Sequence, residues 1–288
     1  MATAPKSTAT ASAVDGLCLE EGRAAAVGIA QAAGDLVRRR ALAGSVTSWA
    51  KSENDLSTPL DQESDALIVE RIHRAFPSHA VLAEETGSHF DQSAPWRWLV
   101  DPLDGSNNIA VGLPIVAIGL TLCHRDRAEL GVVHEPLAGR TLSAVRGERT
   151  RDERNRPVQA RNRTGQPTLI AWTQGYGVRR DDPTAARLRD GLHGYAKRVL
   201  ELWAPLTAWA MLARGDIDGI VGYRIGELDL HSGALVAQMA GAGIEIRGFD
   251  RSPFALDFGG LEESRCIVAA VPRVREELLD LVAGAITP

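Results

Sequence analysis

The segment Trp98-Leu99-Val100-Asp101-Pro102-Leu103-Asp104-Gly105-Ser106-Asn107-Asn108 combines an apolar run, a proline, two carboxylates and a Gly-Ser-Asn-Asn turn. Its first residues are those of a buried strand, and Pro102 has no N–H to donate to a neighbouring strand. We therefore predict that the strand ends at Pro102. Asp101 and Asp104 would then lie at the carboxyl edge of a sheet.

This edge carries the atoms that a hard cation prefers. The carboxylates of Asp101 and Asp104 and the backbone carbonyl of Leu103 are all hard oxygen ligands, which suit Mg²⁺. The same pattern has a simpler interpretation, because Asp, Pro, Gly and Asn all favour surface turns. The rest of the chain has to distinguish the two.

The turn after Asp104 is suited to an anion. Gly105 allows a ligand to approach the backbone closely, and Ser106 and Asn107 are good N-cap residues. Backbone amides at a helix start bind phosphate, so we expect a phosphate cradle here. Metal ligands and an anion cradle in one turn indicate phosphate chemistry.

The composition bounds the class of protein. A chain of 288 residues allows one large or two modest domains with an ample core. A net charge of −5 and a pI near 5.8 give no support for a nucleic-acid partner. No apolar run reaches transmembrane length, so we expect no membrane association.

The first residues of the chain and its cysteines both indicate a cytoplasmic protein. Residues 1–15 are rich in Ala, Ser and Thr and are expected to be a disordered tail, not a signal peptide. Cys18, Cys123 and Cys266 have neither metal-site nor disulfide spacing. We interpret them as free thiols in a reducing cytoplasm.

The first half of the chain predicts helices at 16–40 and 64–76, because apolar residues recur there at helical spacing. Residues 44–55, which include Lys51, are polar and are expected to form a mobile loop. Asp61 precedes the second helix, and its simplest role is that of a helix-start residue.

A short apolar strand at 80–83 ends in Glu84 and Glu85. Two adjacent acids at a strand end are unusual in a packing role, because one of them must point inward. The ends of this strand and of its neighbour would present Glu84, Asp101 and Asp104 together.

Later segments predict more strands and helices. Residues 115–145 have the pattern of an antiparallel meander, and the mixed-charge run 146–157 that of a solvated hairpin or loop. After 168, strands and helices alternate, which argues for α/β organisation. We place one half at 16–160, with most of the acids, and the other at 161–288.

Five acids lie at the ends of elements: Asp61, Glu84, Asp101, Asp104 and Asp229. In one pocket they would repel each other unless cations neutralised them. Two or three divalent ions would do so, polarise a phosphoryl group and generate hydroxide from bound water.

Three motifs together resemble those of the inositol monophosphatase family, a branch of the fructose-bisphosphatase-like, Mg²⁺-dependent and lithium-sensitive phosphatases. They are Ala83-Glu84-Glu85, Val100 to Asn108, and Leu228-Asp229. Two further matches, Leu130 to Pro136 and Asn155 to Val158, lie outside the site. The resemblance implies a layered α-β-α-β-α sandwich of mixed α+β and α/β character, commonly a homodimer.

The resemblance also implies metal ligands. Glu84, Asp101 and the Leu103 carbonyl would hold one Mg²⁺, and Asp101, Asp104 and Asp229 would hold a second.

It implies further roles around the metals. Asp61 and Ser106 would orient or deprotonate the attacking water, and a hydroxyl hydrogen-bonded to a carboxylate can do this. The amides of Gly105 and Ser106, with Asn107 beside them, would hold the phosphate. Lys51 matches a family lysine near a third metal ion.

The chain departs from the family in the segments that read the substrate. Trp203-Ala204-Pro205 replaces a Gly-Ser/Thr-Ala segment, and Gly222 stands where an acid often reads a hydroxyl. His231 either faces the substrate or is a satisfied helix histidine. The resemblance implies a small phosphorylated sugar, polyol or cyclitol as the expected substrate. Histidinol phosphate, a 3'(2'),5'-bisphosphate nucleotide and a sugar bisphosphate are alternatives, and so is a non-catalytic, anion-binding member.

Overall fold

A computed structural model of the chain describes residues 13–14, 17–44, 46–52, 55–125, 127–226, 228–247, 253–254 and 266–286. Of the expected tail, Ala13–Val14 forms strand β1, which pairs antiparallel with β2 (Leu17–Cys18). The rest of residues 1–15 lies outside the described residues.

Helices form where the apolar spacing predicts them. The described residues contain α1 (Leu19–Leu42), α2 (Pro59–Ala75), α3 (Ser106–Ala110), α4 (Pro183–Tyr195), α5 (Pro205–Arg214), α6 (Leu228–Met239) and α7 (Pro272–Ile286). The second helix begins at Pro59, five residues before the predicted start at Ser64, because Thr58 caps it. Asp61 therefore lies inside the first turn of α2 and not before the helix.

The first large sheet has seven strands in the order β11-β10-β9-β8-β7-β5-β6. Its strands are β5 (Ala80–Ala83), β6 (Gly87–His89), β7 (Trp96–Asp104), β8 (Ala117–His124), β9 (Arg127–Glu135), β10 (Arg140–Val145) and β11 (Arg151–Asp152). Only β5 and β7 pair in parallel among the described strands of this sheet. The consecutive antiparallel strands β8, β9 and β10 confirm the predicted meander.

The second large sheet has six strands in the order β13-β12-β14-β17-β15-β16. Its strands are β12 (Leu169–Gln174), β13 (Arg198–Leu200), β14 (Gly219–Tyr223), β15 (Gly243–Arg247), β16 (Pro253–Phe254) and β17 (Cys266–Ala270). Both β13 and β14 run parallel to β12. The carboxyl end of β12 is therefore an edge at which loops can build a binding site.

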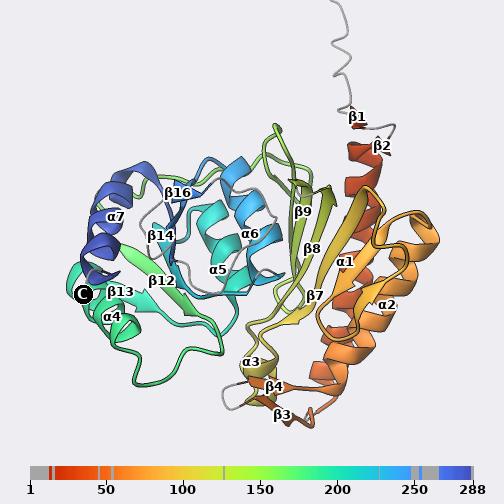
Figure 1. Cartoon of the computed structure of the whole chain (residues 1–288), viewed down its shortest axis with the longest axis horizontal. Helices are drawn as coiled ribbons and strands as arrows, with labels where there is room; N and C mark the ends of the chain where they lie inside the picture. Colours follow the sequence, from red (N-terminus) through yellow and green to blue (C-terminus); the bar gives the residue numbers. More distant parts are fainter. Residues whose placement is uncertain are drawn as a thin grey trace, which may run out of the picture.

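The elements stack in five layers, as Figure 1 shows. Helices α1 and α2 cover one face of the seven-stranded sheet, and α5 and α6 fill the space between the two sheets. Helices α4 and α7 cover the outer face of the six-stranded sheet. The predicted α-β-α-β-α sandwich is confirmed.

The seven-stranded sheet is covered on both faces, which explains the nearly continuous apolar runs of its central strands. Along β8, Ile118, Leu120 and Leu122 belong to the core against α1 and α2, while Ala117 and Cys123 belong to the core against α5 and α6. This alternation follows from the two-residue period of a strand. Packing on both faces thus fixes the position of the sheet, including the ends of its strands.

Two local predictions are wrong. The strand does not end at Pro102, because β7 continues to Asp104 with a bulge: the step from Asp101 to Asp104 on β7 faces the shorter step from Gly119 to Ala117 on β8. The extra residue leaves the missing N–H of Pro102 outside the ladder. The predicted loop at 44–55 instead includes a hairpin of β3 (Trp49–Ser52) and β4 (Asp55–Ser57).

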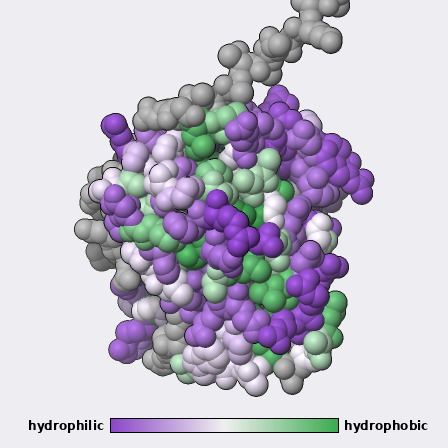
Figure 2. All heavy atoms as spheres, turned by 90° about the vertical axis from the view of Figure 1, so that its right-hand side faces the viewer, coloured by the Kyte–Doolittle hydropathy of each residue, from purple (hydrophilic) through white to green (hydrophobic). Residues whose placement is uncertain are grey.

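The outer face of α1 and α2 is largely hydrophilic, with hydrophobic side chains among the charged ones (Figure 2). Arg40 of α1 forms an ion pair with Glu63 of α2 at 2.5 Å. No helix in the described part of the chain is long and apolar enough to cross a membrane. The three cysteines are free thiols, as predicted.

Candidate active site

The parallel pairing of β5 and β7 brings two acidic strand ends together. Ala83 lies opposite Val100, and the N–H of Glu84 donates to the carbonyl of Val100 at 3.1 Å. Glu84, the residue after β5, and Asp101 of β7 therefore lie next to each other at the same edge of the sheet. Glu84 is exposed there, whereas Asp101 is only 2 % exposed.

The bulge in β7 turns Asp104 toward the second half of the chain. Its Oδ2 accepts a hydrogen bond from the N–H of Leu206 at 2.7 Å, in the first turn of α5. The positive end of the helix dipole stabilises a carboxylate in this position. Asp101 in turn accepts a bond from the N–H of Leu103 at 3.1 Å. Both buried aspartates are thus held by backbone donors.

Helix α2 supports this edge with three buried polar residues at positions i, i+3 and i+4: Asp61, Ser64 and Asp65. Ser64 Oγ donates to the carbonyl of Pro102 at 2.7 Å. Asp65 accepts from the N–H of Glu85 at 3.2 Å and from Thr86 Oγ1 at 2.6 Å. Ser64 and Asp65 hold the two strand ends in place, and the sequence reasoning missed both, although their helical spacing from Asp61 was visible.

Asp61 forms a capping box with Thr58, whose N–H and Oγ1 donate to Asp61 Oδ2 at 2.7 and 2.6 Å. Burial raises the pKa of Asp61 to about 6, and the negative charge of Glu85 acts in the same direction, against the hydrogen bonds from Thr58. The helix-start interpretation of Asp61 is therefore confirmed. A raised pKa also fits a proton acceptor that works near neutral pH.

Ser106 and Asp61 do not form the hydroxyl–carboxylate pair that the sequence reasoning expected. Ser106 Oγ donates to the carbonyl of Leu56 at 2.8 Å, and the neighbouring Asn107 Oδ1 accepts from the N–H of Leu56 at 3.2 Å. This expectation is wrong because the backbone of β4 lies against α3 and offers the nearer partners. The β3–β4 hairpin thus lies against the turn at Ser106.

The N-cap of α3 is Gly105, not Ser106 or Asn107 as predicted. Its φ of 91° lies in the left-handed region that only glycine adopts without strain. A Cβ at this position would lie 2.7 Å from the carbonyl oxygen of Ile115. Conformation and space both require glycine here, in the turn where the sequence predicts a phosphate cradle.

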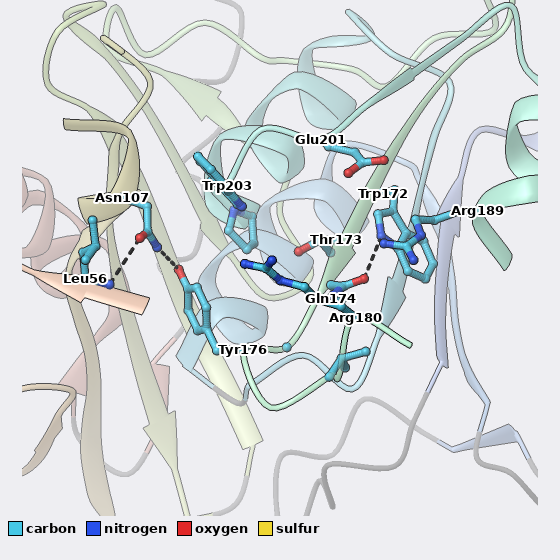
Figure 3. A pocket seen from close by; sticks show the side chains of 13 residues that line it. Leu56, Asn107, Trp172, Thr173, Gln174, Tyr176, Arg180, Arg189, Glu201 and Trp203 are labelled. Carbon is cyan, nitrogen blue, oxygen red and sulfur yellow. Dashed lines mark hydrogen bonds between the residues drawn. The ribbon is translucent and has the colours of Figure 1, made fainter. Parts of the chain in front are cut away.

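A pocket of about 420 Å³ opens beside this turn, and Figure 3 shows it from close by. Asn107 and Tyr176 lie on one side of the pocket, joined by a 3.3 Å hydrogen bond, and Trp172 and Arg189 lie on the other. Its lining consists of Leu56, Asn107, Trp172, Thr173, Gln174, Gly175, Tyr176, Val178, Arg180, Arg189, Glu201, Trp203 and Pro205. Residues from both halves of the chain therefore share one pocket.

The other predicted site residues fall into three groups. Trp203 and Pro205 line the pocket. His231 is completely buried in α6 and does not line it, and burial lowers the pKa of its imidazole to about 3. The backbones of Lys51 and Asp229 lie in β3 and α6, and their side chains lie outside the described part of the structure.

Among the described residues, the acids lie at one edge of the sheet but do not form a complete set of metal ligands. Among the side chains that the structure describes, no three of His, Cys, Asp or Glu gather as they would around a metal ion. Asp101 and Asp104 each accept a bond from a different backbone N–H, and such bonds favour the charged form of a buried carboxylate.

The sequence reasoning missed most of the pocket lining, above all Tyr176, Arg180 and Arg189. One signal was available: Trp172 to Gln174 end a strand that is followed by a helix, and ligands bind at the carboxyl ends of parallel strands. The helix residue Arg189 carried no such signal, because only packing brings it to the pocket.

Comparison with known proteins gives the same fold. The chain is 27 % identical over 237 residues to the Nus factor SuhB of Pasteurella multocida, which covers 81 % of this chain and 84 % of that protein. The extragenic suppressor protein suhB of Bartonella henselae superposes with a TM-score of 0.79 at 20 % identity, covering 91 % of this chain and 98 % of that one. The Thermotoga maritima IMPase superposes with a TM-score of 0.76 at 22 % identity, covering 91 % and 96 %.

A family model matches nearly the whole chain. The model of the inositol monophosphatase family matches residues 18–285, which include both large sheets, the acidic strand ends and the pocket. This chain therefore belongs to the inositol monophosphatase family.

Proposed function

We propose that this protein is a Mg²⁺-dependent phosphomonoesterase that acts on a small sugar, polyol or cyclitol phosphate. The observation that supports this most is the shared edge of β5 and β7, which carries Glu84, Asp101 and Asp104. Asp104 is hydrogen-bonded to Leu206, the residue after the pocket residue Pro205. Family membership supports the same reaction class.

The donor set fits Mg²⁺. The proposed ligands are the carboxylates of Glu84, Asp101, Asp104 and Asp229 and the carbonyl of Leu103, all hard oxygen donors. Two or three Mg²⁺ ions, when bound, would neutralise these acids, polarise the phosphoryl group and lower the pKa of a water molecule. Buried carboxylates such as Asp101 and Asp104 gain most from such neutralisation, because burial penalises their charge.

The chain's own residues would then position the reactants. Thr58 occupies Oδ2 of Asp61, which leaves Oδ1 to accept the proton of the attacking water. Ser106 keeps its lone pairs available while its proton is donated to Leu56, so its hydroxyl can accept a hydrogen bond from that water. The amides of Gly105 and Ser106 would hold the phosphate oxygens, with Asn107 at the pocket wall.

Removal of the metal tests the proposal directly. Phosphate release from a panel of sugar, polyol and cyclitol phosphates, with histidinol phosphate and 3'(2'),5'-bisphosphate nucleotides included, should require Mg²⁺ and stop in excess EDTA. Restoring free Mg²⁺ should restore the rate. Turnover that persists in EDTA would contradict the metal mechanism.

A non-catalytic role is the competing proposal, since the Pasteurella relative is named a Nus factor. We favour hydrolysis for this chain, because a binding protein would need neither the buried Asp101 and Asp104 next to the exposed Glu84 nor a turn that requires glycine at residue 105. A complete lack of phosphate release over the panel would reverse this preference. We also propose a cytoplasmic homodimer, which sedimentation velocity would test.

A further inference from the structure

The pocket contains two arginines without partners among the described residues. Arg180 and Arg189 line it, and neither makes a hydrogen bond or ion pair with any residue that the structure describes. Their neighbour Arg179 behaves differently, because it forms an ion pair with Asp181 at 2.8 Å on the surface. Cations that line a cavity and lack an internal counter-charge are available to an external anion.

The charge of the lining favours an anion. Its charged side chains are Arg180, Arg189 and Glu201, which leaves an excess of one positive charge. In Figure 3, Arg180 lies in the middle of the pocket and Arg189 lies beside Trp172, while Glu201 stands apart from both. The phosphate turn at Asn107 forms the opposite wall, so the arginines do not belong to the phosphate-binding turn itself.

The strained backbone of Trp203 adds a second observation. Its φ of 50° lies in the left-handed region, which is costly for a side chain as bulky as indole. The side chain is nevertheless 59 % exposed and lines the pocket. Strain of this kind persists where function uses the conformation, and here it keeps an aromatic surface at the pocket.

We propose that this pocket binds a second acidic group of the substrate, so that the preferred substrate carries a phosphate or carboxylate in addition to the phosphate ester that is cleaved. The inference rests on the proposed phosphatase function for the cleavage step. Arg180 and Arg189 bind the second anion, since guanidinium groups match the planar or tetrahedral oxygens of both. Trp203 contacts the apolar face of the ring between the two anions.

The volume is consistent with such a ligand. Small-molecule sites measure roughly 300–1,000 Å³, and this pocket of about 420 Å³ leaves room for a ring and a second anion next to the turn. A monophosphate would leave both guanidinium groups solvated, so it would gain nothing from them. The second anion therefore determines selectivity, while the turn and the acidic edge determine the chemistry.

Two pairs of substrates test the inference. Fructose 1,6-bisphosphate is compared with fructose 6-phosphate, and 6-phosphogluconate with glucose 6-phosphate. We expect kcat/KM for the doubly acidic member to be about tenfold higher in at least one pair. The first pair reports a second phosphate and the second pair a carboxylate.

The variants connect this selectivity to the arginines. Arg180→Gln combined with Arg189→Gln should reduce the ratio of the two kcat/KM values about tenfold, chiefly through KM. Arg179→Gln is the matched control, since it removes a neighbouring arginine outside the pocket, and it should leave the ratio unchanged. An equal rate for both members of each pair, or an unchanged ratio in the double variant, would overturn the inference and leave the phosphatase proposal standing.

A binding measurement separates the two proposals. Tryptophan fluorescence is titrated with fructose 1,6-bisphosphate and fructose 6-phosphate in EDTA, where no turnover is expected. Tighter binding of the bisphosphate that disappears in the double variant supports the second-anion site even if no substrate is hydrolysed. Equal binding of both sugars by the wild-type protein counts against it.

Discussion

The acidic edge of the seven-stranded sheet and the pocket at the carboxyl end of β12 are built in opposite ways. At the edge, Asp101 and Asp104 are 2 % and 6 % exposed and each is fixed by a backbone N–H. In the pocket, Arg180 and Trp203 are exposed, and Arg180 makes no bond to any described residue. The edge is preorganised, as the catalytic role that we propose would require, whereas Arg180 in the pocket is available to the second anion that we propose.

The largest expected effect belongs to the edge. Asp104→Asn should lower kcat about a thousandfold, because a metal ligand lost from the reacting centre costs several kcal/mol of transition-state stabilisation. The amide oxygen can still accept the bond from Leu206, so the fold should remain stable. Asp152→Asn, at a half-buried acid of β11 that lies outside the acidic edge and the pocket, is the control. A near-native rate in Asp104→Asn would show that Asp104 matters no more for kcat than the control residue Asp152, and would contradict its role as a metal ligand.

Substitution of Ser106 tests whether the turn after Asp104 takes part in catalysis together with the acidic edge. Ser106→Ala should reduce kcat about 10–100-fold with little change in KM, because the hydroxyl acts mainly in the transition state. Ser106→Thr keeps the hydroxyl and should be tolerated. If Ser106 only anchors Leu56, then Ser106→Ala lowers the free energy of unfolding by about 1 kcal/mol and leaves kcat unchanged. Both quantities should be measured on one preparation.

Comparing Gly105 with Gly112 separates the cost of a left-handed φ from the cost of a steric clash, because both glycines have similar backbone conformations. Gly105 and Gly112 have φ values of 91° and 80°, but only at Gly105 would a Cβ meet backbone, with the Ile115 oxygen at 2.7 Å. Gly112→Ala should lower the free energy of unfolding by about 1 kcal/mol. Gly105→Ala should lower it by about 1–3 kcal/mol more. Equal losses in urea unfolding would show that the phosphate turn is no more tightly packed than the loop.

The smallest effect on stability is expected in the pocket. Trp203→Gly relieves a left-handed residue, so the free energy of unfolding should stay the same or rise by up to about 1 kcal/mol, while kcat/KM falls about tenfold. Phe90→Gly relieves a similar φ of 64° outside the pocket and should leave kcat/KM unchanged. A loss of stability without a loss of activity would make Trp203 a packing residue.

Local patterns were sufficient for most elements. The strand at Ala80–Ala83 was predicted with the bounds that the structure has, because the pattern of a short strand depends on neighbours within a few residues. The acidic strand ends at Glu84 and Asp101 could be placed together for the same reason. Pro102 was misread, because whether a proline ends a strand depends on the partner strand and its bulge.

The sequence by itself determined which chemical groups are present: hard oxygen donors near strand ends, a glycine turn that we propose binds phosphate, and a layered α/β pattern. Only the tertiary structure decided which of these groups meet. Asp104 reaches Leu206, and Asn107 shares a pocket with Arg189, across intervals in the sequence that no local pattern spans. The reason is that side-chain periodicity sets the faces of an element, whereas packing of both sheets against α5 and α6 sets which faces and ends come together.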